Sequence, residues 1–382
     1  MNDDARRMPG PPPPTAVRTV GDPDLAALVG RAVAHHGRVE RATHHFHTYP
    51  AGMHPDSARD LIGTLDTPAP GIHDPFCGGG TVPTEALLAG RPASGTDLSP
   101  IALWVTRTRT ARPEHAGGLR RASRKIAALA REHGPVRIPE IAHEWYEPHV
   151  LDELGRIRAE VEEVEDPSVQ KLLLAVLSSI VIKASFRESD TSNRRRPYHR
   201  PPGTTAILFH KKARELGRML DQLPGEGEVR VRLGDARRVG PPKRTGLVLT
   251  SPPYPGVYDY VPMQQLRYAW LDLDPSRGMV GEVGSRRQFR SQGRRDALAV
   301  WRKDTRAWIA CQAERLLPGG FFAITIGDGL VGGRPVDTLG PTVGALESAG
   351  LTIAARASAD RPDHARATTR TEHLVLARRP VT

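Results

Sequence analysis

The sequence contains few cysteines and no long hydrophobic run. Its two cysteines, Cys77 and Cys311, are too few for a disulfide framework or for a structural zinc site of the usual four-ligand kind. We therefore expect a reducing, cytoplasmic environment. The longest apolar run, residues 172–184, contains two serines and a lysine and falls short of the ~20 residues that a membrane span needs. The first residues also lack the apolar stretch of a secretory signal, so no membrane association is predicted.

Lysine is also scarce, because only seven of the 54 basic residues are lysines and the rest are arginines. Against 43 acidic residues, they give the chain of 382 residues a formal net charge of +11. Arginine suits phosphate and guanine recognition. An arginine-rich composition also follows from a coding sequence that favours arginine codons. The charge alone therefore leaves nucleic-acid binding and compositional drift equally open.

Short apolar strands alternate with helices on either side of a long helical segment. Residues 1–22 include a proline run and are predicted to form a disordered tail. The alternation occupies residues 23–110 and 226–382, and it predicts a doubly wound, mostly parallel sheet with helices on both faces. Residues 111–225 lack strand patterns and predict a helical insertion. The expected strands are 71–75, 92–97, 229–234, 245–250, 321–327, 351–357 and 372–377, and the late expected helices include 260–273 and 300–316.

The most informative segment is Asp74-Pro75-Phe76-Cys77-Gly78-Gly79-Gly80-Thr81. A predicted strand ends in a turn of three glycines and passes directly into a helix, and Asp97 ends the next strand 17 positions after Gly80. Glycines at a helix N-terminus let the backbone approach a ligand closely, and an acid at the second strand end accepts hydrogen bonds from ribose hydroxyls. The Gly-Lys-Ser/Thr of a phosphate-cradling loop is missing. The segment predicts a nucleoside cofactor site, with a tight strand-to-helix connection as the alternative.

A second segment, Ser251-Pro252-Pro253-Tyr254, follows the strand predicted at 245–250. Methylation of an exocyclic amine needs acceptors for the amino hydrogens, because the nitrogen lone pair is delocalised into the ring. The Ser251 hydroxyl and the Pro252 carbonyl could act as these acceptors, held by the fixed φ of proline. Tyr254 would stack on the base, a contact worth ~1–3 kcal/mol. A base in a duplex must first be flipped out of the stack.

The two segments together resemble the cofactor and catalytic motifs of the S-adenosylmethionine-dependent amino-methyltransferases that modify cytosine N4 or adenine N6 in DNA. Tyr49-Pro50-Ala51 resembles the family segment that closes over the methionine end of the cofactor, and Gly234-Asp235-Ala236 resembles the acid loop near its adenine. The resemblance covers residues 44–110 and 228–378. It implies a Rossmann-like class I methyltransferase fold with a C-terminal antiparallel strand, and S-adenosylmethionine as the cofactor.

The same resemblance assigns roles to particular residues of this chain. The implied catalytic residues are Ser251, Pro252, Pro253 and Tyr254. The implied cofactor-binding residues are Tyr49, Pro50, Asp74, Phe76, Gly78, Gly80, Thr81, Asp97, Leu98 and Asp235.

The sequence departs from the family pattern in two ways. Gly79 stands where the family commonly has serine, which we expect to matter little because the backbone makes the approach. The cofactor motif precedes the catalytic motif, as it does only in some permutation classes of the family. Ser251 favours cytosine N4, since adenine-N6 enzymes usually carry Asp or Asn there. The alternatives are an adenine-N6 DNA enzyme, an RNA guanine-N2 or adenine-N6 methyltransferase, and a non-catalytic, cofactor-sensing DNA-binding protein.

Arginines gather in two predicted loops, 185–200 and 286–295, where they mix with Phe, Tyr, Gln or Asn. These residue types contact phosphates and base edges. DNA is therefore the expected partner, with a cognate restriction nuclease as a further one, and the helical insertion would help to hold the DNA. A solvated run of charge is the alternative for each loop. The candidate nucleic-acid-binding residues are Arg187, Arg194, Arg195, Arg196, Arg286, Arg287, Arg290 and Arg294.

Histidines cluster at positions 44, 45, 47 and 54. We find no acidic or cysteine partners at the spacing of a metal site, and methyl transfer from a sulfonium needs no metal. The sequence therefore predicts no metal ion.

Overall fold

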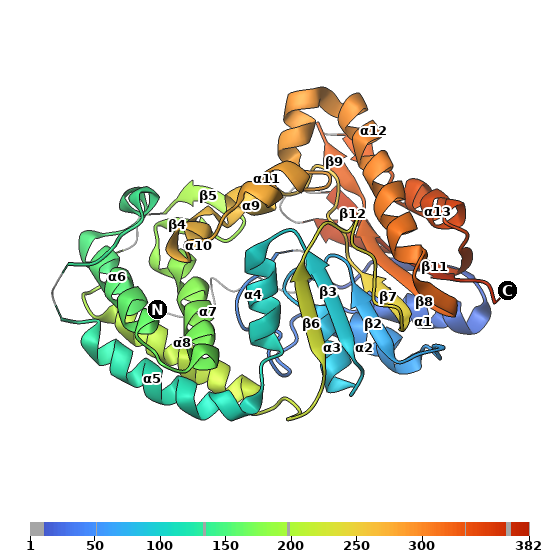
Figure 1. Cartoon of the computed structure of the whole chain (residues 1–382). Helices are drawn as coiled ribbons and strands as arrows, with labels where there is room; N and C mark the ends of the chain where they lie inside the picture. The colour runs from blue at the N-terminus through green and yellow to red at the C-terminus, as the bar shows by residue number, and fades with distance from the viewer. Residues whose placement is uncertain are drawn as a thin grey trace.

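The computed structural model (Figure 1) describes residues 11–50, 52–132, 135–196, 199–332, 334–363 and 368–381. Its central feature is an eight-stranded sheet in the order β1-β11-β12-β8-β7-β2-β3-β6. The strands from β6 to β8 are parallel, and β12, β11 and β1 each pair antiparallel with the preceding strand. The bounds are β1 Ala16–Gly21, β2 Gly71–Asp74, β3 Ala93–Asp97, β6 Val229–Leu233, β7 Thr245–Thr250, β8 Leu316–Gly327, β11 Thr352–Asp363 and β12 Thr368–Arg378. The doubly wound sheet with its C-terminal antiparallel strand is confirmed.

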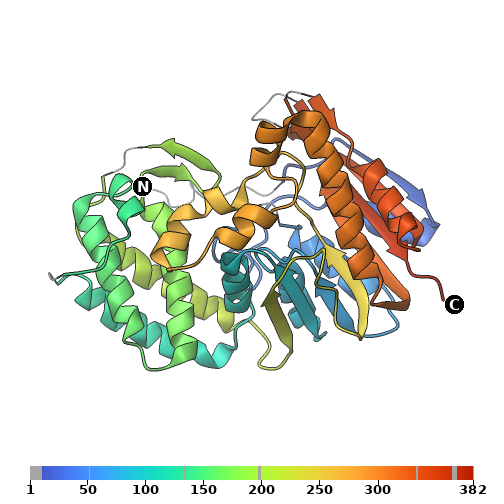
Figure 2. The same cartoon turned by 45° about the horizontal axis from the view of Figure 1, so that its top comes forward.

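Helices cover both faces of the sheet, as Figures 1 and 2 show. On one face, α1 (Pro23–Ala34), α2 (Pro55–Thr64) and α3 (Thr81–Leu88) pack into one apolar core with the strands. On the other face, α12 (Arg286–Ala313) and α13 (Leu339–Ser348) form a second core. The central strand β7 reads Thr-Gly-Leu-Val-Leu-Thr and is buried throughout. Because side chains alternate along a strand, Leu247 and Leu249 join the first core and Val248 joins the second.

A helical lobe lies beside the edge of the sheet that carries β6 (Figure 1). It has its own apolar core and largely matches the predicted insertion at 111–225. Helix α4 (Pro100–Arg109) connects the sheet to this lobe and packs against α7. The remaining elements of the lobe are η2 Pro113–His115, α5 Ala116–Leu129, η3 Glu140–Glu144, α6 Pro148–Glu162, α7 Pro167–Ala184, β4 Arg187–Ser189, β5 Ser192–Arg195 and α8 Thr204–Leu220.

Helix α7 has the length and apolar composition of a membrane span, and 67% of it is buried within the protein. It packs against α6 and α8 in the core of the helical lobe. A helix that is apolar all round is expected at the centre of such a bundle.

The tail predicted at residues 1–22 is wrong for its last part. Residues 16–21 form β1, the edge strand of the sheet, paired with β11 from Ala16 with Asp360 to Gly21 with Ala355. All six residues are exposed, so burial does not impose an alternation of apolar and polar residues on the segment. Backbone pairing holds this strand, and apolar patterning could not have revealed it.

Two late helices also differ from their predictions. The helix expected at 260–273 is divided into α9 (Tyr260–Met263) and α10 (Gln265–Trp270), followed by α11 (Ser276–Gly281). The helix expected at 300–316 begins at Arg286, with a kink at Gly293 where φ is 77°. The second arginine-rich segment is therefore helical, whereas a loop was predicted. The hairpin of β9 (Gly329–Val331) and β10 (Arg334–Val336) was also not foreseen.

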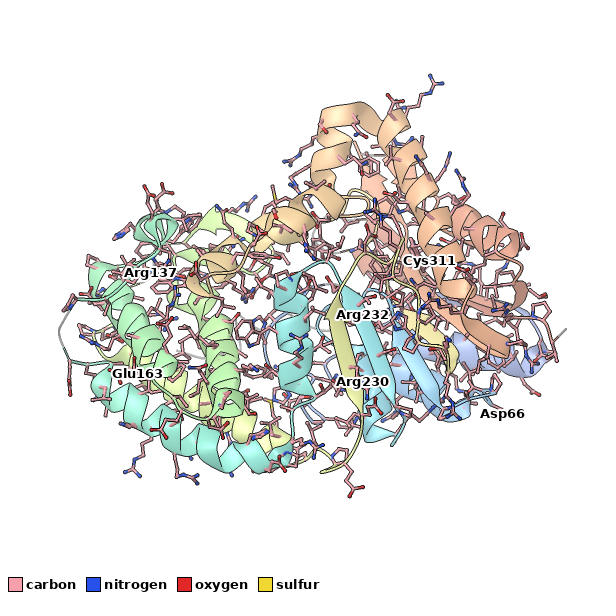
Figure 3. All side chains as sticks on the ribbon, in the orientation of Figure 1. Asp66, Arg137, Glu163, Arg230, Arg232 and Cys311 are labelled. Atoms are coloured by element: carbon pink, nitrogen blue, oxygen red, sulfur yellow. The ribbon has the colours of Figure 1, made fainter. Side chains whose placement is uncertain are left out.

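Both cysteines are free. Cys77 is buried in the glycine turn, and Cys311 lies on α12 (Figure 3). At the sheet edge, Arg230 and Arg232 project from β6 (Figure 3). Charged side chains on an edge strand discourage pairing with another chain.

Candidate active site

The two predicted motifs meet where the strand order of the sheet reverses. Asp74 ends β2 and Thr250 ends the neighbouring strand β7. Although 176 positions separate them in sequence, Thr250 Oγ1 donates a hydrogen bond to Asp74 Oδ1 at 2.7 Å. Ligands of open α/β sheets bind at such a switch point, outside the carboxyl ends of the strands.

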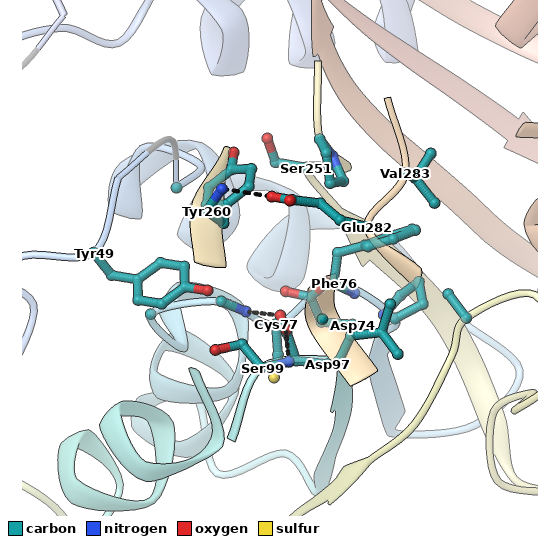
Figure 4. Close-up of a pocket in the computed structure, with 18 of the residues that line it drawn as sticks. Tyr49, Asp74, Phe76, Cys77, Asp97, Ser99, Ser251, Tyr260, Glu282 and Val283 are labelled. Atoms are coloured by element: carbon teal, nitrogen blue, oxygen red, sulfur yellow. Dashed lines mark hydrogen bonds between the residues drawn. The ribbon is translucent and has the colours of Figure 1, made fainter. Parts of the chain in front are cut away.

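A pocket lies at this point (Figure 4), which we call the acidic pocket after its charged lining. It is lined by most of the predicted cofactor-binding residues, namely Tyr49, Pro50, Asp74, Phe76, Gly78, Thr81, Asp97, Leu98 and Asp235. Gly80 stands behind the turn as the N-cap of α3. Ser251 and Pro253 of the catalytic segment line the same pocket. The geometry thus brings both motifs to one cavity.

The glycine turn is held in a conformation that few other residues adopt. Gly78 and Gly80 have φ of 46° and 80°, the left-handed region that favours glycine. A Cβ on Gly80 would lie 2.7 Å from Thr106 Oγ1 on α4. The backbone N–H of Gly78 donates to Asp97 Oδ2 at 3.0 Å, which ties the turn to the end of β3.

The space around Gly79 is also tightly packed. A Cβ there would lie 3.0 Å from Tyr49 Cβ and 3.1 Å from Arg109 Nη1. The serine that is common in the family would therefore require a small shift of these neighbours, whereas the sequence suggested that the change would matter little.

Four acids face the acidic pocket, and the described residues that line it include no lysine, arginine or histidine. Burial raises the pKa of Asp74 to about 7, against hydrogen bonds from Thr250 and the Phe76 N–H. Burial likewise raises the pKa of Asp97 to about 6, against the N–H groups of Ser99 and Gly78. A cationic ligand would stabilise the charged form of these carboxylates.

The other two acids are engaged by arginines. Burial raises the pKa of Glu282 to about 7, although the Tyr260 N–H and Arg287 both bond its carboxylate. Burial also acts to raise the pKa of Asp235, but hydrogen bonds from Arg237 hold it below its ordinary value. Glu282 follows α11 in a segment without a motif, so sequence reasoning missed it.

Aromatic rings surround the catalytic segment. The Tyr254 hydroxyl donates to Glu372 Oε1 at 3.1 Å, and its ring lies against Gly327, where a Cβ would come within 2.6 Å. Tyr49 and Tyr260 stack with ring centroids 6.3 Å apart across the pocket entrance, with Tyr258 next to them. Stacking of Tyr254 on a base stays a prediction, and Tyr258 and Tyr260 are further candidates for that contact.

A second cavity of about 420 Å³ adjoins the acidic pocket and shares Tyr49, Pro50, Gly52 and Met53 with it. It lies between the segment around residues 37–55 and helices α7 and α8 of the helical lobe. We call it the basic cavity, because its charged lining residues are four cations and one acid. They are Arg38, Arg109, Lys183, Lys212 and Glu372.

The first arginine-rich segment is a hairpin of β4 and β5, and its arginines differ in exposure. Arg187 is buried, and its guanidinium donates to the carbonyls of Met263 and Ser192. This position removes Arg187 from the predicted nucleic-acid contacts. Arg194, Arg195 and Arg196 are exposed, and Arg195 lies over the rings of Trp145 and Phe186.

The second arginine-rich segment opens helix α12, close to the catalytic segment. Arg286 donates to the carbonyl of Val257, and Arg287 pairs with Glu282 and Asp259. Arg294 donates to the carbonyl of Pro335, and Arg290 is exposed. Arg287 is thus bound to an acid of the pocket, and Arg290 is the most open of the four.

The predicted absence of a metal concerned the histidines at 44, 45, 47 and 54. The structure places ligand atoms of His35, His54 and Asp56 within 4.8 Å of one another. Asp56 forms ion pairs with Arg41 and Arg59, however. Two guanidiniums compete with any cation for that carboxylate, so we continue to expect no metal ion.

Comparison with known proteins finds a curated relative and several solved structures. No family model matches the chain. The chain is 26% identical over 263 residues to the Type II methyltransferase M.MvaI of Kocuria varians, which covers 60% of this chain. The chain spans 58% of the length of that relative.

Solved structures with similar folds include the rRNA methyltransferase AviRa from Streptomyces viridochromogenes, at 14% identity and a TM-score of 0.35, covering 87% of this chain and 88% of that one. TrmN from Thermus thermophilus matches at 12% identity and a TM-score of 0.33, covering 85% of this chain and 48% of that one. At these TM-scores the superpositions carry no further argument.

Proposed function

We propose that this protein transfers a methyl group from S-adenosylmethionine to the exocyclic amine of a flipped base in DNA, with cytosine N4 as the acceptor. One observation carries the proposal: the glycine turn with Asp97, and Ser251 and Pro253 of the catalytic segment, line a single pocket at the switch point of the sheet. The relative of this chain is a Type II methyltransferase, which supports the same reaction class.

The residues of the acidic pocket fit this cofactor. Asp97 lies at the end of β3, where its carboxylate can accept hydrogen bonds from ribose hydroxyls, and the glycine turn leaves room for close backbone approach. Asp235, in the loop that the resemblance assigns to the adenine, lines the same pocket. When bound, S-adenosylmethionine supplies an electrophilic methyl group on a positively charged sulfur, and a pocket lined with acids favours that charge.

The catalytic segment can orient the acceptor amine. The Ser251 hydroxyl and the Pro252 carbonyl accept the two amino hydrogens, which directs the nitrogen lone pair out of the plane of the base. Pro252 and Pro253 restrict the backbone, so these acceptors are held in place before the base arrives. Tyr258 and Tyr260, whose ring centroids lie 5.6 Å apart, and the predicted stacking residue Tyr254 offer rings on which an extruded base can stack.

DNA is the proposed substrate for two reasons. The relative belongs to the Type II methyltransferases. Helices α7 and α8 of the helical lobe contribute to the basic cavity, and the exposed Arg194, Arg195 and Arg196 lie on or directly after β5 of the same lobe. Ser251 at the first catalytic position favours cytosine N4 over adenine N6. A cognate nuclease and a cytoplasmic location belong to the same proposal.

The test uses purified full-length protein with labelled S-adenosylmethionine and, in parallel, plasmid DNA and total RNA. We expect label in DNA at N4-methylcytosine, identified by mass spectrometry of nucleosides. Ser251→Ala should lower the turnover rate by about 10²- to 10³-fold, because it removes one preorganised acceptor. Ser348→Ala, at the exposed end of α13, is a matched control that should leave the rate within about twofold. Label in RNA alone, or in N6-methyladenine, would contradict the proposal.

A further inference from the structure

Arg109, at the end of α4, is a buried cation without an acidic partner among the described residues. Its side chain is almost fully buried, with 6% of the residue exposed. Nε donates to the carbonyl of Phe46 at 2.9 Å, and Nη2 donates to the carbonyl of His47 at 2.8 Å. Burial lowers the pKa of this guanidinium to about 10. A buried charge that lacks a counter-ion is costly, so the site is suited to an anion.

The third nitrogen of Arg109 lies beside the glycine turn. Nη1 is 3.1 Å from the position that a Cβ on Gly79 would occupy, and Gly79 lines the acidic pocket. Tyr49, which lines both the acidic pocket and the basic cavity, lies against the same face of that glycine, and Arg109 itself lines the basic cavity. The absence of a side chain at Gly79 therefore lets Nη1 approach the backbone of the turn closely.

The charges of the proposed cofactor require a cation next to the acidic pocket. S-adenosylmethionine carries a positive sulfonium, a positive ammonium and one negative carboxylate. The overall acidic character of the pocket suits the two positive groups, but its described lining offers no cation to the carboxylate. Arg109 lies directly beyond the turn and has a nitrogen directed at it.

We propose that Arg109 binds the carboxylate at the amino-acid end of the cofactor, through Nη1 at the face of Gly79. This inference rests on the proposed function, because it assumes the same cofactor in the same pocket. It also gives a reason for glycine at a position where the related motif commonly has serine: a side chain there would push Nη1 away from the turn. The two carbonyl bonds hold the guanidinium in place before the ligand binds.

The test measures binding by calorimetry, without nucleic acid and without turnover. Three ligands are compared: S-adenosylhomocysteine, its decarboxylated analogue, and 5′-methylthioadenosine, which lacks the whole amino-acid end. In Arg109→Met we expect affinity for S-adenosylhomocysteine to fall about tenfold or more, since a charge-assisted hydrogen bond is lost. Affinity for the other two ligands should stay within about twofold. Arg109→Lys keeps the charge and should lose less.

Arg107→Met is the matched control, because Arg107 is an exposed arginine on the same helix and donates to the Val231 carbonyl. It should bind all three ligands as the unaltered protein does. If Arg109→Met weakened all three ligands equally, Arg109 would be a structural clamp for residues 46 and 47, and the inference would be wrong. If Arg109→Met left the affinity for S-adenosylhomocysteine unchanged, the inference would also be wrong. Weaker DNA binding by the same variant would then indicate that Arg109 contacts phosphate. If the unaltered protein bound none of the ligands, the proposed function itself would fail.

Discussion

The acidic pocket and the basic cavity share the wall formed by Tyr49, Pro50, Gly52 and Met53, yet their charges are opposite. The acidic pocket is built mainly from strand ends: Asp74, Asp97 and Asp235 stand at or just after strands, and Glu282 follows α11. The basic cavity is built between the sheet and the helical lobe, and its cations come from separate helices and loops. The difference separates two tasks: one region suits a small cationic cofactor, and the other suits a polyanion.

This contrast also refines what the net charge of +11 means. The excess of arginine is spread over the whole chain, and several arginines do structural work. Arg187 and Arg267 are buried, and Arg267 forms an ion pair with Asp190 beneath the β4–β5 hairpin. The net charge is therefore larger than the charge that the surface can present to nucleic acid. Among the arginines, the exposed ones near the two cavities are the candidates for contacting it.

The largest effect should come from breaking the acidic pocket at Asp97. Its two carboxylate oxygens accept hydrogen bonds from the N–H groups of Gly78 and Ser99. Asp97→Asn turns an amide NH₂ toward one of these donors, so we expect the affinity for S-adenosylhomocysteine to fall about 100-fold, as for the loss of two charge-assisted bonds. Calorimetry measures this, and Asp66→Asn, an exposed aspartate (Figure 3), is the control.

The same variant tests whether the two regions act independently. DNA affinity, measured by fluorescence anisotropy without cofactor, should stay within about threefold in Asp97→Asn. If Asp97→Asn lowered the affinities for S-adenosylhomocysteine and for DNA in parallel, the two cavities would form one site. The proposed separation of their tasks would then be wrong.

An intermediate effect should come from the basic side. The exposed arginines of β5 are a candidate DNA contact, so the triple change of Arg194, Arg195 and Arg196 to alanine should weaken DNA binding about tenfold near 0.1 M salt. The slope of log affinity against log salt should also fall by about two to three, one for each lost phosphate contact. S-adenosylhomocysteine affinity should not change.

The control for this triple variant is a matched set on the opposite side of the same lobe. Arg121, Arg124 and Lys125 are exposed on α5, which lies far from β5 in Figures 1 and 2. Their change to alanine removes the same charge. An equal loss of DNA affinity from both sets would show that net charge alone sets binding, and that β5 is no specific contact.

The sequence predicted the sheet and the motif positions well, because both depend on local signals. Buried parallel strands read as apolar runs, and a glycine turn or a proline pair fixes the backbone by itself. Strand β1 gave no such signal, since all of its side chains are exposed.

The partners of the motifs were not predictable in the same way. Glu282 and Tyr260 reach the acidic pocket, and Arg109 reaches its glycine turn, only because the chain folds back from distant segments. Nothing local marks these residues among similar ones. The exposure of each arginine is likewise a tertiary property. Arg187 and Arg194 look equivalent in sequence, yet one is buried and the other exposed.

The smallest effect should be a pH dependence that the acidic pocket has and the basic cavity lacks. The pKa values of Asp74 and Asp97, about 7 and 6, lie above their ordinary value of 3.8 because both carboxyls are buried. These groups are neutral at pH 5 and charged at pH 8. The free protein therefore loses stability from this source as the pH rises from about 4 through 7.

A cationic ligand reverses that trend, since it stabilises the charged carboxylates and releases their protons on binding. S-adenosylmethionine differs from S-adenosylhomocysteine by the methyl group and the positive charge on sulfur. The ratio of their affinities should thus rise in favour of S-adenosylmethionine between pH 5 and 8, by about two- to fivefold, and then level off. Asp74→Asn should flatten this rise, because it removes the carboxyl with the higher pKa. A ratio that stayed constant across this range in the unaltered protein would mean that the acids do not sense the sulfur charge, and the assignment of the acidic pocket to a sulfonium ligand would be wrong.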